Sequence, residues 1–218
     1  MVKNHHFHTI HKFNCLFIIF INSILGLGSA NNQFHTPKGI DIDSNTGTLY
    51  VSDSQNHRVM AYASGATSGT IAAGGNGPGI ATNQLFFPSG LYWDSASNSL
   101  FVANTGANNI VRWVMGATQW SIVVGDSNGI PGNNSNQLYE PYDVTFDSTG
   151  NMYVADYRNH RIQFFRSGQT NGITIAGTGV SNSNSNQLNG PISVAVDSQL
   201  NVYVSDSSNH RIQKFIRY

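Results

Sequence analysis

Short segments in which apolar and polar residues alternate recur along most of the chain. Four of them lie at residues 39–43, 90–94, 144–147 and 194–197, and each ends in Asp followed by Ser. Alternation with a period of two is typical of a β-strand with one buried face, and the Asp-Ser pair indicates a turn after it. The pattern therefore predicts an all-β protein built from short strands.

Each alternating segment is followed by further short apolar segments at similar distances. A second strand is predicted at 49–53, 100–104, 152–156 and 202–206, and a fourth at 70–74, 122–125 and 174–177. Between them, a third strand begins near 58, 161 and 211. Each unit is expected to form a four-stranded antiparallel sheet, with the last sheet incomplete because the sequence stops soon after its third strand.

The same unit occurs four times in tandem. Its frame begins with Asn-Gln-Phe or Asn-Gln-Leu, and a proline follows three residues later. These prolines are Pro37, Pro88, Pro141 and Pro191, spaced 51, 53 and 50 residues apart. Self-similarity at such a period is typical of solenoids and propellers. The repeats are assigned to residues 31–81, 82–134, 135–184 and 185–218.

Three of the units carry Tyr-Val-x-Asp followed by an Asn-His-Arg triplet, which ends at Arg58, Arg161 and Arg211. This combination resembles the NHL repeat, whose copies form the four-stranded blades of β-propellers. The resemblance implies a β-propeller of four NHL-like repeats over residues 31–218. The second unit departs from it, because the segment from Asn104 to Ile110 lacks the triplet and is interpreted as carrying one inserted residue.

An incomplete last blade would leave one strand edge unpaired. Propellers close by pairing or protecting their strand edges, and a bare edge tends to recruit another chain. We therefore expect either a homo-oligomer formed through the last blade or a partial propeller cut from a longer relative.

An acid and a base stand five residues apart in the same three units. These pairs are Asp53 and Arg58, Asp156 and Arg161, and Asp206 and Arg211. A carboxylate and a guanidinium at the ends of neighbouring strands can form charge-assisted hydrogen bonds across the turn. In the second unit Asn104 replaces the acid and Ile110 is placed at the position of the base, so both charges are lost together. Since one buried charge without its partner is costly, we interpret these as structural pairs, with a ligand-binding role as the alternative.

The triplet histidines, His57, His160 and His210, raise the alternative of a zinc site, because three imidazoles are a common zinc set. Equivalent residues of different blades are a blade's width apart, whereas zinc ligands must lie within ~2.1 Å of one ion. Residues 41–47 read Asp-x-Asp-x-Asn-x-Gly, like the start of a calcium loop, but no late bidentate carboxylate follows. We therefore interpret the triplet histidines and residues 41–47 as parts of turns, and we expect no metal or cofactor.

The first thirty residues differ from the rest of the chain. Two lysines precede an apolar run at 15–27, and small residues follow up to Ala30. This arrangement is typical of a secretory signal peptide, so residues 1–30 are predicted to be cleaved after Ala30, with a retained membrane anchor as the alternative. The mature protein would be secreted, free of membrane, and without its only cysteine, Cys15. Asn133, in the sequon Asn-Asn-Ser, is the predicted glycosylation site.

Charge is sparse and balanced. The chain has 11 basic and 11 acidic residues, and two of the basic ones fall within the first thirty, so the mature part would be slightly acidic. Nucleic-acid-binding faces usually show a basic excess. No nucleic-acid partner is therefore expected.

One side of the predicted propeller carries both the turns between second and third strands and the long links to the next blade; we term it the loop face. Loops on a rigid scaffold often carry function. Candidate partner-binding residues are those near the prolines or in these turns that differ between repeats, namely Phe86, Phe87, Tyr139, Glu140, Tyr142, Tyr157 and Arg158. For the two phenylalanines, packing between blades is an equally weighted alternative.

The sequence contains no His-x-Glu motif. We therefore expect a non-catalytic extracellular interaction module that binds a protein or peptide on the loop face, and not an enzyme. The resemblance leaves two alternatives, a zinc-dependent peptidyl-amidating-lyase-like propeller and a ubiquitin-ligase-associated or RNA-binding NHL propeller. Ligase chemistry would need Cys/His-rich zinc domains, which a cysteine-free mature chain could not form.

Overall fold

The computed structural model describes residues 26–216 of the 218. The predicted signal peptide lies outside the described residues, except for its last five. The described chain forms fifteen β-strands in four antiparallel sheets, which confirms the all-β propeller expected from the sequence. No helix within residues 26–216 has the length and apolar character needed to cross a membrane.

The strands of each sheet follow one another in sequence order. The first sheet contains β1 (Pro37–Asp43), β2 (Thr48–Asp53), β3 (Arg58–Tyr62) and β4 (Thr70–Gly74). The second contains β5 (Pro88–Asp94), β6 (Ser99–Asn104), β7 (Asn109–Val114) and β8 (Ser121–Gly125). The third contains β9 (Pro141–Phe146), β10 (Met152–Asp156), β11 (Arg161–Phe165) and β12 (Ile173–Gly177). The last contains β13 (Pro191–Val196), β14 (Val202–Asp206) and β15 (Arg211–Phe215).

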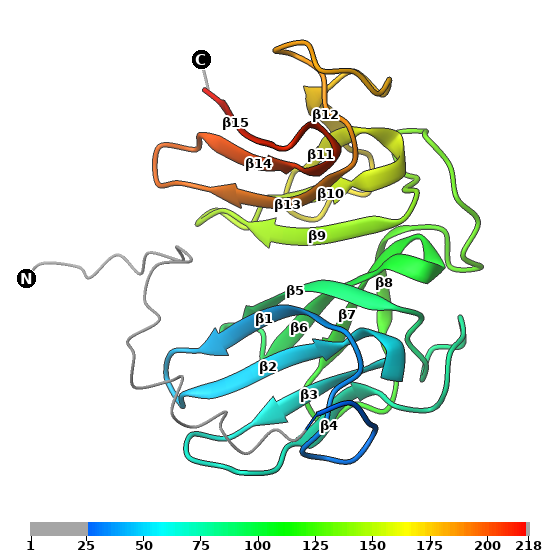
Figure 1. The fold of residues 1–218 in the computed structure, drawn as a ribbon, viewed down its shortest axis with the longest axis vertical. Coiled ribbons are helices and arrows are strands. Elements are labelled where there is room, and N and C mark those ends of the chain that lie inside the picture. The colour runs from blue at the N-terminus through cyan, green and yellow to red at the C-terminus, as the bar shows by residue number, and fades with distance from the viewer. Residues whose placement is uncertain (1–25, 217–218) are drawn as a thin grey trace, which may run out of the picture.

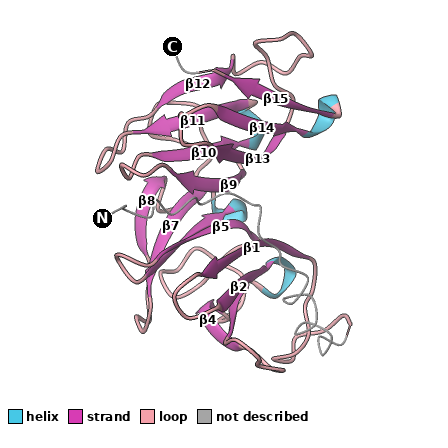
Figure 2. Cartoon of the chain, turned by 90° about the vertical axis from the view of Figure 1, so that its left-hand side faces the viewer, coloured by secondary structure: helices cyan, strands magenta, loops and turns pink. Residues whose placement is uncertain are grey.

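The four sheets are blades grouped around a central axis (Figures 1 and 2). The first strands β1, β5, β9 and β13 pack on one another at the centre, and the later strands of each blade lie farther out (Figure 2). The last blade has three strands, so the expectation of an incomplete sheet is confirmed. Within the described residues, no strand of the last blade pairs with a strand of the first.

A single-turn 3-10 helix connects the second and third strands of every blade. These helices are η1 (Ser54–Asn56), η2 (Thr105–Ala107), η3 (Tyr157–Asn159) and η4 (Ser207–Asn209). The next residue is left-handed each time, with φ of 54° at His57, 55° at Asn108, 48° at His160 and 53° at His210. Because Asn and His are enriched in this region among non-glycine residues, the local turn explains why these types recur there.

The second blade keeps the register of the others. Asn104 pairs with Asn109 across β6 and β7, just as acid and arginine pair in the other blades. The interpretation of an inserted residue, with Ile110 at the position of the base, was therefore wrong. Asn109 occupies that position, and Asn108 takes the left-handed position of the histidine, because the turn has the same length in all four blades.

The hydrophobic core lies between successive blades. Tyr50 and Val59 of the first blade pack against Trp93 and Val102 of the second, and the rings of Tyr50 and Trp93 stack with their centroids 4.7 Å apart. Equivalent clusters join the second blade to the third and the third to the fourth. In such repeat proteins each unit is stabilised mainly by its neighbours, since a single sheet cannot bury its own faces.

The first blade begins before residue 31. The carbonyl of Gly28 accepts a hydrogen bond from Asn56 Nδ2 at 2.8 Å, and the carbonyl of Ala30 accepts one from Arg58 Nη2 at 3.0 Å. Equivalent side chains bond the preceding loop in the third blade as well. Residues 28–30 therefore take part in the packing of the first blade.

Candidate functional site

Asp156 lies at the centre of a buried network in the third blade. Its carboxylate accepts hydrogen bonds at 2.8 Å from Arg161 Nε, from Asn159 Nδ2 and from the backbone N–H of Tyr139. Ion pairs of the same length join Asp53 to Arg58 and Asp206 to Arg211. All three carboxylates are fully buried, and they tie the end of the second strand to the turn and to the loop before the first strand.

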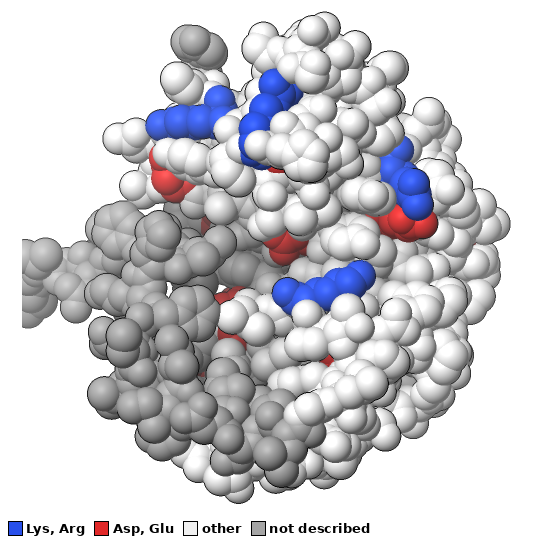
Figure 3. Space-filling model, in the orientation of Figure 1, with Lys and Arg blue, Asp and Glu red and all other residues white. Residues whose placement is uncertain are grey.

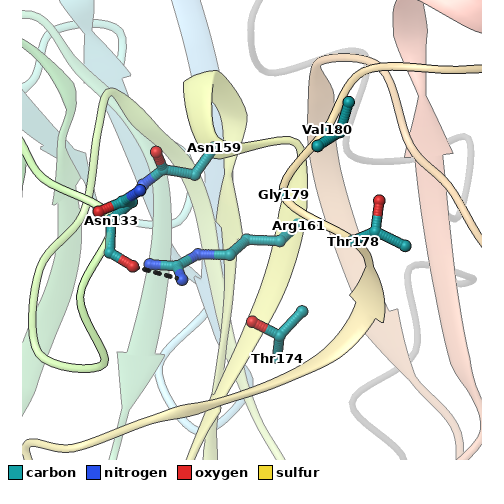
Figure 4. A pocket seen from close by; sticks show the side chains of 7 residues that line it. All are labelled: Asn133, Asn159, Arg161, Thr174, Thr178, Gly179 and Val180. Atoms are coloured by element: carbon teal, nitrogen blue, oxygen red, sulfur yellow. Dashed lines mark hydrogen bonds between the residues drawn. The ribbon is translucent and has the colours of Figure 1, made fainter.

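A polar cleft of about 360 Å³ lies beside this network on the third blade (Figure 4). It is lined by Asn133, Asn159, Arg161, Thr174, Thr178, Gly179 and Val180. The guanidinium of Arg161 donates to the carbonyl of Asn133 at 2.9 Å, while Asn133 itself is exposed. The backbone at the sequon is thus fixed, and its side chain is accessible.

A compact cluster of aromatic and charged side chains occupies the loop face of the third blade. The rings of Tyr142 and Tyr157 are in contact, with centroids 4.8 Å apart. Arg158 lies over the ring of Tyr157 at 5.2 Å and pairs with Glu140 at 2.9 Å. Lys38 of the first blade reaches Tyr142, its Nζ atom 4.6 Å from the ring centroid. We term these five residues the tyrosine cluster.

Tyr139 adjoins the tyrosine cluster through the backbone. Its carbonyl accepts the N–H of Arg158 at 3.1 Å, and 40% of the residue's surface is exposed. Of the seven candidate contact residues, five therefore lie together at one place on the loop face.

Phe86 and Phe87 form a separate group. Their rings stack with centroids 4.8 Å apart, and His57 of the first blade lies against both. Both phenylalanines are half-buried between the first and second blades. This placement is the inter-blade packing that the sequence left as an alternative.

Lys38 is a member of the tyrosine cluster that sequence reasoning did not identify. It follows Pro37 as Tyr142 follows Pro141, so the shared frame marks the two residues as equivalent. The contact between Lys38 and Tyr142 depends on the distance between the first and third blades across the axis. The repeat pattern in the sequence gives no information about that distance.

Two carboxylates line the inner strands. Asp143 accepts hydrogen bonds from Ser193 Oγ at 2.8 Å and from the N–H of Val194 at 3.0 Å, and Asp41 accepts the N–H of Trp93 at 2.7 Å. Desolvation raises the pKa of Asp143 to about 6, and the negative charge of Asp41 adds to this effect. Both groups join neighbouring blades.

The triplet histidines do not converge. Each lies in the turn of its own blade, and His57 and His160 accept a backbone N–H from the following blade. Desolvation lowers the pKa of both imidazoles below their ordinary value, and the charge of Arg158 adds to this at His160. In the part of the chain that the structure describes, no three His, Cys, Asp or Glu side chains are grouped to hold a metal ion. In residues 41–47, Asp43 bonds the N–H of Asn45 within the turn.

Charge is scattered over the surface. Figure 3 shows single Lys and Arg side chains set apart from one another on the face in view, some of them beside Asp or Glu, and they form no continuous basic patch on that face of the described residues. The tyrosine cluster is therefore distinguished by its aromatic area combined with charge, and not by net charge alone.

Comparison with known proteins identifies the repeat in three blades and finds solved structures with a similar fold. The sequence profile of the NHL repeat matches residues 34–62, 138–165 and 188–215, which lie in the first, third and fourth blades. No curated protein matches the sequence.

Three solved structures illustrate the similarity of fold. An auxiliary nutrient binding protein from Bacteroides thetaiotaomicron is 18% identical, with a TM-score of 0.64 over 81% of this chain and 46% of that one. A gluconolactonase from Xanthomonas campestris is 17% identical, with a TM-score of 0.66 over 87% and 60%. Streptogramin B lyase is 12% identical, with a TM-score of 0.57 over 83% and 54%. The chain thus spans about half the length of these structures.

These structures correct the expectation that the chain is not an enzyme. Two of the three similar propellers are named for a catalytic activity, gluconolactonase and lyase. The expectation rested on the lack of a His-x-Glu motif, and the lack of one short motif is a poor criterion for a propeller. Residues far apart in sequence, such as Asp41 and Asp143, come within electrostatic range on the inner strands.

Proposed function

Because three of its four blades carry NHL repeats in a propeller fold, we propose that this chain binds a protein or peptide ligand on its loop face, through the tyrosine cluster and Tyr139. The observation that carries the proposal is the contact of Lys38, Tyr142, Tyr157 and Arg158 across two blades. Tyrosine and arginine are enriched among the residues that dominate binding energy at protein interfaces.

The charges of the cluster favour a ligand with an acidic group. Arg158 is already paired with Glu140, whereas Lys38 lies over a tyrosine ring and makes no ion pair among the described residues. Its ammonium group has three hydrogen-bond donors to offer. A peptide could place a carboxylate at the ammonium group of Lys38 and an apolar side chain against the ring of Tyr142 or Tyr157.

We further propose that binding takes place outside the cell. The signal-like N-terminus supports export, and the exposed side chain of Asn133 can accept a glycan there. The name of the Bacteroides propeller, an auxiliary nutrient binding protein, supports ligand binding as a use of the fold.

An immobilised array of acidic, neutral and basic peptides tests the proposal. The full chain should retain acidic peptides, and Lys38→Ala and Tyr157→Ala should each weaken binding about tenfold or more, while the melting temperature changes little. Arg166→Ala is the matched control, because Arg166 is an exposed cation just after β11, at the opposite end of the same blade. Equal binding by all four proteins would rule out the tyrosine cluster as the site.

A second candidate function is acid–base catalysis at the axis, and the feature that favours it is the carboxylate of Asp143 on the inner strand β9, which accepts a hydrogen bond from the hydroxyl of Ser193 and lies within electrostatic range of Asp41; burial raises its pKa to about 6. A carboxyl group that titrates near neutrality can give and take a proton under working conditions. Hydrolysis of a sugar lactone, the substrate class suggested by the name of the Xanthomonas propeller, is the first reaction to assay. Asp143→Asn should abolish such activity, and Asp94→Asn, at the end of β5 where the carboxylate accepts the N–H of Ala96, should not.

A further inference from the structure

All three junctions between blades share one hydrogen bond. The left-handed residue after each 3-10 helix accepts a backbone N–H from the next blade. His57 Nδ1 accepts from Phe87 at 3.2 Å, Asn108 Oδ1 from Glu140 at 2.8 Å, and His160 Nδ1 from Gly190 at 3.1 Å. The donor residue also has a positive φ each time.

The same junctions share an apolar contact region. The residue two places after each acceptor, which is Val59, Ile110 or Ile162, is fully buried. The following blade contributes Leu91, Val144 or Val194, which are also buried. We term the side of a blade that carries the acceptor and its buried apolar residue the leading face, and it contacts the following blade. We term the side that carries the N–H donor and its own apolar residue the trailing face, and it contacts the preceding blade.

The leading face of the fourth blade carries the same residues without a neighbour. His210 occupies the acceptor position and is exposed, and no hydrogen bond to its side chain is made within the described residues. Ile212 occupies the apolar position, and its surface is 70% exposed, whereas its three counterparts are fully buried.

The trailing face of the first blade carries the complementary residues. Thr36 occupies the donor position, with φ of 55°, and its N–H donates to no group within the described residues. Ile40 occupies the position of Leu91, and 49% of its surface is exposed. The two free faces of one chain are therefore the two halves of the junction that the chain forms internally three times.

We infer that the leading face of the fourth blade binds the trailing face of the first blade in a second copy of this chain. His210 of one copy accepts the N–H of Thr36 in the other, and Ile212 packs against Ile40. The contact is head-to-tail and face-to-face. It differs from pairing through the bare strand edge, because the edge of β15 takes no part in it.

Two single variants and their mixture test the inference by sedimentation velocity on the full chain. The wild type should associate in a concentration-dependent way, and Ile212→Asp or Ile40→Asp should each weaken association about tenfold or more, because an unpaired carboxylate would be buried. Ile173→Asp is the matched control. Ile173 is 60% exposed on the outer strand β12 and belongs to neither face.

The mixture separates head-to-tail binding from other modes of association. Ile212→Asp keeps a normal trailing face and Ile40→Asp keeps a normal leading face, so an equimolar mixture should associate more strongly than either variant alone. A wild type that is monomeric at all concentrations overturns the inference. So does an Ile40→Asp variant that associates as well as the wild type, because that result would assign the contact to two copies of the last blade.

Discussion

His57 of the first blade accepts a hydrogen bond through Nδ1 from the backbone N–H of Phe87 in the second blade, 3.2 Å away. The histidine of this Asn-His-Arg triplet therefore bonds the next blade, whereas Asp53 and Arg58 pair within one blade. Only a neutral imidazole offers an acceptor nitrogen, since both nitrogens of the protonated ring are donors. The junction is thus sensitive to acid.

Acid should weaken the junctions that use histidine. Desolvation lowers the pKa of His57 and His160 in the folded state below the ordinary 6.5, so their contribution to stability is complete above 6.5 and is lost as the pH falls through the folded pKa. The double variant His57→Asn and His160→Asn copies the acceptor Asn108 of the second blade. Its melting temperature should fall less than that of the wild type between pH 7.5 and pH 5. Identical pH profiles would contradict this role.

Asp143 should act in the opposite direction over the same range. Desolvation raises its pKa to about 6, above the ordinary 3.8, so its contribution to stability is complete below 3.8 and is lost as the pH rises through about 6. The melting temperature of the wild type should therefore fall relative to that of Asp143→Asn when the pH is raised from 5 to 7.5. The carboxyl ¹³C shift of Asp143 should titrate near pH 6, and a midpoint near 4 would disprove the effect.

Removing the acid of the third blade should destabilise the protein strongly. Asp156→Ala leaves the buried guanidinium of Arg161 uncompensated, which costs about 3–5 kcal/mol. For a protein of this size that corresponds to a fall of roughly 10 °C in melting temperature. Asp206→Ala should cost less, because the side chain of Arg211 is 29% exposed. Calorimetry that finds the two losses equal would refute the dependence on burial.

A matched double variant separates the loss of charge from the loss of contacts. Asp156→Asn combined with Arg161→Asn reproduces the neutral pair of Asn104 and Asn109, which the second blade holds at 3.2 Å. It should be more stable than Asp156→Ala, since no charge is left unpaired.

The start of the folded unit can be tested by shortening the chain. A protein that begins at Asn31 lacks the carbonyls of Gly28 and Ala30, which accept hydrogen bonds from Asn56 and Arg58. Hydrogen bonds to neutral and charged donors contribute about 1 and 2 kcal/mol. A chain that begins at Gly26 should therefore unfold at a higher urea concentration than one that begins at Asn31. Coincident unfolding curves would show that residues 28–30 add nothing to stability.

The sequence predicts most of the fold because each blade repeats the same short-range signals. The spacing of Asp53 and Arg58 fixes a register across one turn, and the alternating segments fix which faces are buried. The second blade was misaligned because Asn108 and Asn109 are the same residue type, so the sequence alone does not show which of them takes the place of the arginine.

The candidate site was only partly predictable, because it depends on distances between blades. Tyr142 and Tyr157 are fifteen residues apart in one blade, and the frame suggested their proximity. The contact of Lys38 with Tyr142 and the raised pKa of Asp143 arise from packing across the axis. No local pattern encodes that geometry.

The neutral pair of Asn104 and Asn109 has a consequence for the order in which the protein comes apart. Acid protonates the acceptor nitrogens of His57 and His160, but it acts neither on the amide–amide hydrogen bond of the second blade nor on its Asn108 junction to the third blade. In acid the second blade should keep its internal hydrogen bonds and its contact with the third blade, while the first and last blades separate at their histidine junctions. Unfolding would then proceed from both ends of the array towards a resistant middle, from which refolding can start again.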